Sequence, residues 1–264
     1  MKEKMEKKKH GITIYQPEGA AAEYAKWACN LYNGCSNRCD YCYNRHSQRK
    51  NLLGKDDITP KKMWSADDLY HKFQDELDRW RGYIIEDGGL HFNFVSDPCL
   101  PETWQLNLRC IRYAMLNCVP VRILTKMHNW MDYPDWRALF MVGFFRERRG
   151  YIKFGFTLTG MDEMEHGAST NAQRIDTMRQ LHKEGYQTWA SIEPVIDIRK
   201  STDMILQTLD CCDEYRIGLN SLKKAYTPAD VRKFKEQIDG VMLTDNVPRM
   251  VIWKESVLKF IEKD

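Results

Sequence analysis

Short apolar segments alternate with longer amphipathic segments along most of the chain. Six apolar segments are rich in β-branched or aromatic residues and are short enough to be strands; they cover residues 27–32, 90–96, 119–125, 151–159, 187–196 and 215–219. Strands that alternate with helices six times are typical of a parallel sheet built from βαβ units. The pattern therefore predicts an α/β fold, either an open doubly wound sheet or a barrel.

The amphipathic segments carry helix signals. Three of them begin with capping sequences, at Ser65-Ala-Asp-Asp68, Thr170-Asn-Ala-Gln173 and Thr227-Pro-Ala-Asp230, and hydrophobic residues follow each at helical spacing. Helices with weaker caps are expected near residues 102–116, 135–142 and 202–211. Each predicted helix lies between two predicted strands or after the last one, as a βα repeat requires.

Polar residues stand at the C-terminal ends of most predicted strands. They are Ser96, Asp97, Thr125, Lys126, Thr157, Thr159, Glu193 and Asn220. In a barrel these strand ends converge on one mouth, where catalytic groups collect, whereas in an open sheet they lie in a line. The position of the polar residues therefore favours a barrel.

The composition is that of an ordinary globular protein, with 264 residues, 43% hydrophobic residues, 29% charged residues and a net charge of +3. No apolar run is long enough to span a membrane. The segment from Met1 to His10 is rich in lysine and glutamate and lacks the apolar stretch of a secretory signal. We therefore expect a cytoplasmic protein, whose weak positive charge permits a polyanionic partner without requiring one.

Nine cysteines without a secretory signal favour metal binding over a disulfide framework. Cys35, Cys39 and Cys42 follow the first predicted strand in the spacing C-x3-C-x2-C. Three thiolates on one loop can hold three irons of a four-iron cluster, and the fourth iron is then open to S-adenosylmethionine. A zinc site that adds His46 as fourth ligand and a purely structural cysteine loop are the alternatives.

The cysteine motif, with Tyr41 as the aromatic residue before Cys42, resembles the signature of the radical S-adenosylmethionine superfamily. The residues from Ala22 to Gly34, and later Val95 to Glu102 and Val121 to Lys126, resemble the branch that contains spore photoproduct lyase and DNA repair photolyase-like proteins. The resemblance spans residues 20–200, strongly at the cysteines and loosely elsewhere. It departs from the family at residues 96–98, where the usual glycine-rich motif is replaced by Ser-Asp-Pro.

The resemblance implies a partial (β/α)6 barrel of the TIM type, with the cluster loop after the first strand. We place this barrel at residues 19–240, between a disordered basic tail at residues 1–18 and a C-terminal extension at residues 241–264 that packs on it. The implied cofactors are a [4Fe-4S] cluster and S-adenosylmethionine, which the cluster cleaves to a 5′-deoxyadenosyl radical. A reductant such as flavodoxin or ferredoxin would supply the electron.

The same resemblance implies a lyase- or transferase-like reaction in which hydrogen is abstracted from a nucleic-acid lesion or a nucleotide. A peptide or small-molecule substrate is one alternative, and a non-catalytic zinc or iron–sulfur module that binds nucleic acid is another. Basic residues after the cluster loop are suitable for contacting a phosphate backbone. They are Arg38, Arg45, His46, Arg49 and Lys50.

Candidate cofactor contacts lie near the cluster loop. Asp97 is a candidate acceptor for the methionine ammonium group, and Lys126 is a candidate partner for the methionine carboxylate. Thr159 and Glu193 are candidates for the ribose hydroxyls, and Tyr41 is expected to pack near the cluster and the adenine. Asp97 as the cap of an Asp-Pro turn and Lys126 as a solvated strand edge are the structural alternatives.

Cys99 is a candidate catalytic residue. The S–H bond of a thiol is weak, so a cysteine can give a hydrogen atom to a product radical. Cys99 comes two residues after Asp97 and is expected to face the barrel mouth. The alternative is that Cys99 only fills the turn between Pro98 and Leu100.

Overall fold

The computed structural model describes residues 9–136, 146–220, 225–244 and 249–262. Within these ranges a central sheet contains eight strands in the order β1-β2-β5-β6-β7-β8-β9-β10. Their bounds are Ile14–Tyr15 (β1), Ala28–Cys29 (β2), Leu90–Phe92 (β5), Val121–Thr125 (β6), Ile152–Thr157 (β7), Gln187–Val195 (β8), Glu214–Leu219 (β9) and Met250–Trp253 (β10). All neighbouring pairs from β2 to β10 are parallel, and β1 is antiparallel to β2.

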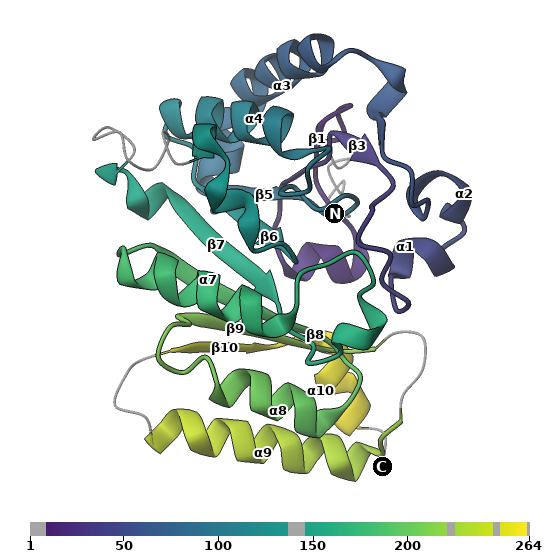
Figure 1. Cartoon of the computed structure of the whole chain (residues 1–264), viewed down its shortest axis with the longest axis vertical. Coiled ribbons are helices and arrows are strands. Elements are labelled where there is room, and N and C mark those ends of the chain that lie inside the picture. Colours follow the sequence, from purple (N-terminus) through teal and green to yellow (C-terminus); the bar gives the residue numbers. More distant parts are fainter. Residues whose placement is uncertain (1–8, 137–145, 221–224, 245–248, 263–264) are drawn as a thin grey trace, which may run out of the picture.

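The parallel strands follow one another across the sheet in chain order. Within the described ranges this order never reverses, so the sheet lacks the switch point that defines a doubly wound fold. The α/β prediction and the parallel sheet are therefore confirmed. Figure 1 shows α3 and α4 packed beside β5 and β6, and α8 and α9 beside β9 and β10.

The helices connect successive strands. Their bounds are Tyr43–His46 (α1), Lys50–Leu53 (α2), Ala66–Glu86 (α3), Trp104–Leu116 (α4), Asn171–Lys183 (α7), Ile198–Leu206 (α8), Pro228–Thr244 (α9) and Glu255–Ile261 (α10). The predicted caps hold at all three sites: the Ser65 hydroxyl accepts the Asp68 N–H, Thr170 and Gln173 form a capping box, and the Thr227 hydroxyl accepts the Asp230 N–H at 3.2 Å. The predicted helix at residues 135–142 lies mostly outside the described residues.

One predicted strand differs from the observed one, and one observed strand was not predicted. The segment 27–32 contributes β2 to the main sheet and then Tyr32 to a separate ribbon, in which β3 (Tyr32–Asn33) pairs with β4 (Thr59–Pro60). Residues 250–253, predicted within a C-terminal extension, form β10, which pairs in parallel with β9. A four-residue strand is too short to show a period in the sequence.

Residues 9–18 are part of the folded structure, although the sequence predicts a disordered tail over residues 1–18. The carboxylate of Glu76 in α3 accepts the backbone N–H groups of Ile12, Thr13 and Ile14 at 2.7–2.9 Å, and the Thr13 hydroxyl at 2.7 Å. Ile14 is fully buried and pairs with Cys29. The long-range contact to a buried carboxylate fixes a strand that charge composition alone does not suggest.

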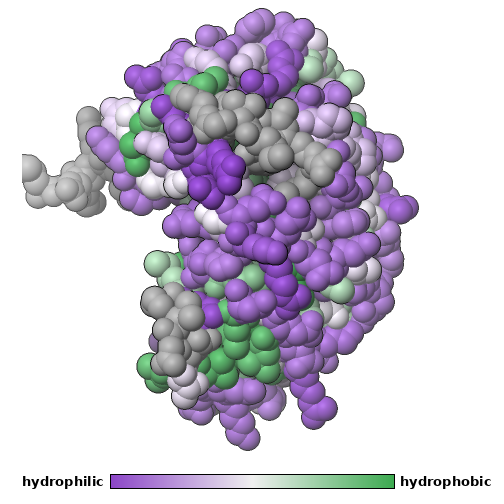
Figure 2. Space-filling view, turned by 60° about the vertical axis from the view of Figure 1, so that its left-hand side comes forward, coloured by the Kyte–Doolittle hydropathy of each residue, from purple (hydrophilic) through white to green (hydrophobic). Residues whose placement is uncertain are grey.

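The surface is largely polar. Within the described ranges, no helix combines the length and the apolar composition that crossing a membrane requires. Figure 2 shows a mainly hydrophilic face, with hydrophobic side chains gathered toward its lower end, the level of α8, α9 and β10 in Figure 1.

Candidate functional site

A cavity of about 400 Å³ lies at the C-terminal ends of the parallel strands. Cys35, Cys39 and Cys42 line it together with polar residues from five consecutive strand ends. These polar residues are Ser96, Asp97, Thr125, Lys126, Thr157, Glu193 and Asn220. The structure thus brings together the residues that the sequence placed at strand ends, with the exception of Thr159.

The cysteine loop is held where it leaves β3. Gly34 has a φ of +82°, and a Cβ at this position would lie 2.1 Å from the carbonyl oxygen of Asp57, so only glycine fits. The Gly34 carbonyl accepts the Ser96 hydroxyl at 2.5 Å, and the Cys35 N–H donates to the Lys55 carbonyl at 2.9 Å. The ribbon of β3 and β4 therefore fixes both ends of the loop that carries the cysteines.

The loop after β7 packs directly against the cysteine loop. The Asp40 N–H donates to the Met164 carbonyl at 3.0 Å, and the Gly167 N–H donates to the Asn37 carbonyl at 2.9 Å. A Cβ at Gly167 would lie 2.0 Å from the Ser36 carbonyl oxygen. The two loops approach so closely that the position of the cysteines depends on the loop after β7.

A buried ion pair anchors this contact. The Glu165 carboxylate pairs with the Arg174 guanidinium of α7, and both side chains are at most 1% exposed. The Tyr41 hydroxyl donates to Glu165, which also accepts the Thr159 hydroxyl at 3.3 Å. Burial and the adjacent carboxylate raise the pKa of Tyr41 well above its usual value, so the phenol is a neutral donor. Tyr41 thus links the cysteine loop to α7 through Glu165.

Burial favours the neutral form of the Cys35 and Cys39 thiols by raising the pKa of each. Burial, and next the Asp97 carboxylate, raise the pKa of Cys35 to about 12. Burial also raises the pKa of Cys39, against the opposing effect of the Lys126 ammonium group. Metal ligation requires thiolates, so binding a metal here releases protons.

The ligands of a zinc site that would use His46 do not come together in the part of the chain that the structure describes. His46 Nε2 lies 3.0 Å from the Asp40 carbonyl oxygen, on the exposed side of α1. Among the described residues, no three His, Cys, Asp or Glu side chains converge as they would around a single ion. Thiolates that bind different irons of one cluster lie farther apart than the ligands of one ion. The spacing of the side chains therefore argues against a zinc site and does not argue against a cluster.

Asp97 is fully engaged by the protein. Its carboxylate accepts the Thr125 hydroxyl at 2.7 Å, the Lys126 N–H at 2.6 Å, the Asn37 amide at 3.0 Å and the Cys99 N–H at 3.0 Å. A carboxylate offers about four lone-pair positions, and these four donors use them. Asp97 therefore ties the cysteine loop to β6, and its role as an acceptor for the methionine ammonium group stays a prediction.

Two other groups of the cavity wall have unused hydrogen-bonding capacity. The Lys126 ammonium group has no ion pair or hydrogen bond with the described residues; it lies 5.5 Å from the centre of the Tyr41 ring. Burial works to lower the pKa of Lys126, but Cys39 and Glu165 outweigh it and raise the pKa, which keeps the ammonium group charged. Asn37 Oδ1 is buried without a partner, while Asn37 Nδ2 binds the same Asp97 oxygen as the Lys126 N–H.

Glu193 of β8 lies at the part of the wall that also contains Lys254, the residue after β10. Its carboxylate accepts both the Tyr24 hydroxyl and the ammonium group of Lys254, whose Nζ is 2.8 and 3.0 Å from the two oxygens. Tyr24, Glu193 and Lys254 all line the cavity. Lys254 is therefore the cationic partner of the Glu193 carboxylate.

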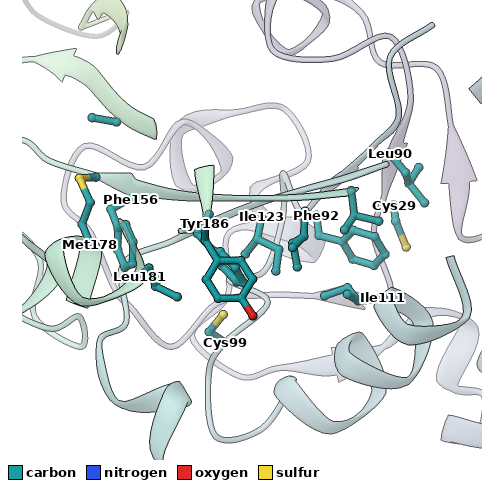
Figure 3. Close-up of a cluster of buried hydrophobic side chains, with 14 of the residues drawn as sticks. Cys29, Leu90, Phe92, Cys99, Ile111, Ile123, Phe156, Met178, Leu181 and Tyr186 are labelled. Carbon is teal, nitrogen blue, oxygen red and sulfur yellow. The ribbon is translucent and has the colours of Figure 1, made fainter. Parts of the chain in front are cut away.

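Two predicted site residues lie outside the cavity wall. Thr159 is fully buried, and its hydroxyl is used by Glu165 and by the Met161 N–H, so Thr157 takes its place in the wall. Cys99 is also fully buried and belongs to the hydrophobic core, as Figure 3 shows. The hydrogen bond from the Cys99 N–H to Asp97 closes a turn that directs the thiol inward, so the prediction that Cys99 faces the mouth is wrong.

Solved structures share this fold. Spore photoproduct lyase superposes with a TM-score of 0.63 at 14% identity, over 90% of this chain and 80% of that one. A spore photoproduct lyase mutant with bound AdoMet and dinucleoside spore photoproduct gives a TM-score of 0.53 at 16% identity, over 88% and 65%. SuiB of Streptococcus suis bound to S-adenosylmethionine gives 0.58 at 11% identity, over 84% and 48%.

The resemblance that the cysteine motif carries is therefore confirmed at the level of the fold. The chain spans about half the length of SuiB, which has also been solved with its precursor peptide SuiA. No family model and no curated protein matches the sequence.

Sequence reasoning missed several residues that build the site. Lys254 and the pair Glu165–Arg174 occupy segments without a motif. Tyr24 lies in the segment from Ala22 to Gly34, but its partner Glu193 is distant in the chain. Asn37 stands inside the cysteine motif, but only the structure reveals that its amide oxygen is unpaired. A lysine directly after the apolar segment 250–253 was the one signal that pointed to Lys254.

Proposed function

We propose that the chain is a radical S-adenosylmethionine enzyme with a partial (β/α)6 barrel. Cys35, Cys39 and Cys42 would hold a [4Fe-4S] cluster, and S-adenosylmethionine would bind in the adjoining cavity. The observation that carries the proposal is that the three cysteines and the unpaired Lys126 line one cavity at the strand C-termini. Strands β2 and β5 to β9 supply the six strands of the barrel, and β10 extends it.

The unused groups of the wall are suited to an amino acid. The Lys126 ammonium group complements a carboxylate, and the orphaned Asn37 Oδ1 complements an ammonium group. Asp97 binds the backbone N–H of Lys126 and the amide nitrogen of Asn37 through one oxygen, and both residues line the cavity, so their free groups can engage the two ends of one methionine moiety. When bound, the cluster and S-adenosylmethionine would supply a 5′-deoxyadenosyl radical by one-electron cleavage of a carbon–sulfur bond.

The protein's own residues then have three tasks. Lys126 and Asn37 orient the methionine moiety, and Asp97 holds both of them against the cysteine loop. Tyr41 and Glu165 fix the loop from the other side. The buried walls exclude water, which protects a reactive radical from side reactions.

Anaerobic reconstitution tests the function. With iron, sulfide and a reductant such as dithionite, flavodoxin or ferredoxin, the protein should turn brown, bleach on reduction and convert S-adenosylmethionine to 5′-deoxyadenosine. A zinc module would stay colourless and form no 5′-deoxyadenosine. Candidate substrates that carry deuterium should then transfer the label into 5′-deoxyadenosine.

We propose a nucleic-acid lesion or a nucleotide as the substrate. The cysteine motif and its flanks resemble the branch of spore photoproduct lyase, and Arg38, Arg49 and Lys50 are exposed beside the cluster loop. Tyr43, also exposed there, offers a face on which a base can stack. Label transfer from a deuterated peptide, but from no nucleotide or lesion-bearing oligonucleotide, would refute this choice of substrate.

Lys126→Met should weaken S-adenosylmethionine binding about tenfold or more, because a charge-assisted contact contributes about 1.5–3 kcal/mol. The cluster spectrum should not change, since the Lys126 ammonium group makes no hydrogen bond or ion pair to the cysteine loop and meets it only through the Tyr41 ring. Isothermal titration of the oxidised, cluster-loaded protein measures the affinity without turnover. Lys183→Met, an exposed lysine of α7, is the matched control. Equal affinity in the two variants would contradict the assignment of Lys126.

A further inference from the structure

Lys254 is an unusual lysine because its side chain is buried among hydrogen-bond partners. It is 2% exposed, and its ammonium group donates to both Glu193 oxygens and to the Ala20 carbonyl at 3.1 Å. The same ammonium group lies 4.3 Å from the centre of the Tyr24 ring. Burying a lysine costs free energy unless its charge is paired, and Glu193 pairs the charge of Lys254.

The Glu193 carboxylate is fixed on all sides but one. It packs on the backbone of Gly218 in β9, where an added Cβ would lie 2.6 Å from the carboxyl carbon. Lys254 uses one lone-pair position on each oxygen, and the Tyr24 hydroxyl uses a third. Of about four positions on a carboxylate, one is left, and Glu193 lines the cavity.

Tyr24 is a donor in this group. Burial, and then the charge of Glu193, raise the pKa of Tyr24 well above its usual value. The phenol oxygen also lies 2.7 Å from the Ser191 hydroxyl, two residues before Glu193 on β8. The group therefore presents one fixed, negatively charged acceptor to whatever occupies this side of the cavity.

We infer that Lys254 is a positioning residue: it holds the Glu193 carboxylate at the cavity wall, where the remaining lone pair accepts a hydroxyl of a bound nucleoside. The inference rests on the function proposed above and adds to it a residue that directly follows β10 and caps α10. Lys254 acts through Glu193 and does not contact the nucleoside. A ligand edge that donates hydrogen bonds suits this wall, because the open position belongs to a carboxylate oxygen.

The experiment measures how much more tightly a nucleoside with ribose hydroxyls binds than one without them, which we call hydroxyl discrimination. It uses four proteins: wild type, Glu193→Gln, Lys254→Met and the double variant. Adenosine and 2′,3′-dideoxyadenosine compete with S-adenosylmethionine for the oxidised, cluster-loaded protein. Wild type should bind adenosine about tenfold or more tightly, because a site built to bond a hydroxyl rejects the analogue that lacks it. Glu193→Gln should lose most of this preference, and Lys254→Met should lose it as well.

The double variant separates positioning from stability. Lys254→Met leaves a buried carboxylate without its cation and should lower Tm, whereas the neutral double variant should recover Tm. The double variant should discriminate no worse than Glu193→Gln, because Lys254 has nothing left to position. This comparison stands even if the single Lys254 variant fails to fold.

Three outcomes would overturn the inference. Recovery of both Tm and discrimination in the double variant would make the pair purely structural. A further tenfold loss relative to Glu193→Gln would show that Lys254 touches the ligand itself. Normal discrimination in Glu193→Gln would remove the proposed contact. Failure of the wild type to bind S-adenosylmethionine is a separate result, which would refute the proposed function and the inference together.

Discussion

Replacing Cys35, Cys39 or Cys42 by alanine should abolish iron binding and the formation of 5′-deoxyadenosine. A site of three thiolates has no spare ligand, and the three side chains come from one loop with fixed ends. Wild type should hold about four irons per chain after reconstitution, and each variant should hold a small fraction of that amount. Iron and sulfide analysis, with the visible spectrum, measures the loss independently of activity.

Two control variants define the specificity of this loss. Cys118→Ser removes an exposed thiol that does not line the cavity and should keep the full iron content. His46→Ala should also keep the iron, because His46 bonds to the Asp40 carbonyl and not into the cavity. Full cluster retention in one of the three alanine variants would refute the ligand assignment. Loss of the metal with His46→Ala would favour the zinc alternative.

Arg174→Met should lower the free energy of unfolding by about 3–5 kcal/mol, because it leaves the buried Glu165 carboxylate without its cation. For a chain of this size that loss corresponds to a decrease in Tm of about 2–4 °C per kcal/mol. The Arg174 side chain also donates to the carbonyls of Thr157 and Ser169, which lie at the end of β7 and just before α7. Cluster loading should therefore decrease as well, since this loop packs on the cysteine loop.

Calorimetry of the protein without its cluster measures the stability effect by itself. Arg179→Met is a matched control on the same helix: Arg179 pairs with Asp210 at the surface, and exposed pairs contribute at most about 1 kcal/mol. The double variant Arg174→Met/Glu165→Gln should regain much of the stability, because neither charge is then left unpaired. A Tm for Arg174→Met equal to that of Arg179→Met would contradict the role of the buried pair.

Several features of this protein can be read from local sequence alone. The alternation of short apolar segments with capped amphipathic helices predicts a parallel α/β sheet, because hydrophobic periodicity and helix caps depend on neighbouring residues. The spacing of Cys35, Cys39 and Cys42 is local in the same sense. The rule that parallel strand ends meet at one edge then places Asp97, Lys126 and Glu193 around one cavity, as the structure shows.

The predictions that failed concern the direction of single side chains. Thr157 and Thr159 both follow an apolar strand, yet only Thr157 reaches the cavity. Cys99 was expected at the mouth because of its sequence distance from Asp97, but a turn around the Asp97 carboxylate buries its thiol. Hydrogen bonds in the loop decide which way a side chain points after a strand ends. These bonds cannot be predicted from the periodic pattern of the sequence.

The sequence by itself determined the class of fold, the cysteine motif and the end of the sheet at which the site lies. Only the tertiary structure decided which partners complete the site. Lys254 is 61 residues from Glu193, and Tyr24 is 169 residues from it, so no local pattern connects them. Their meeting depends on the order of the strands and on the burial of charges that must then be paired, and both are properties of the folded chain as a whole.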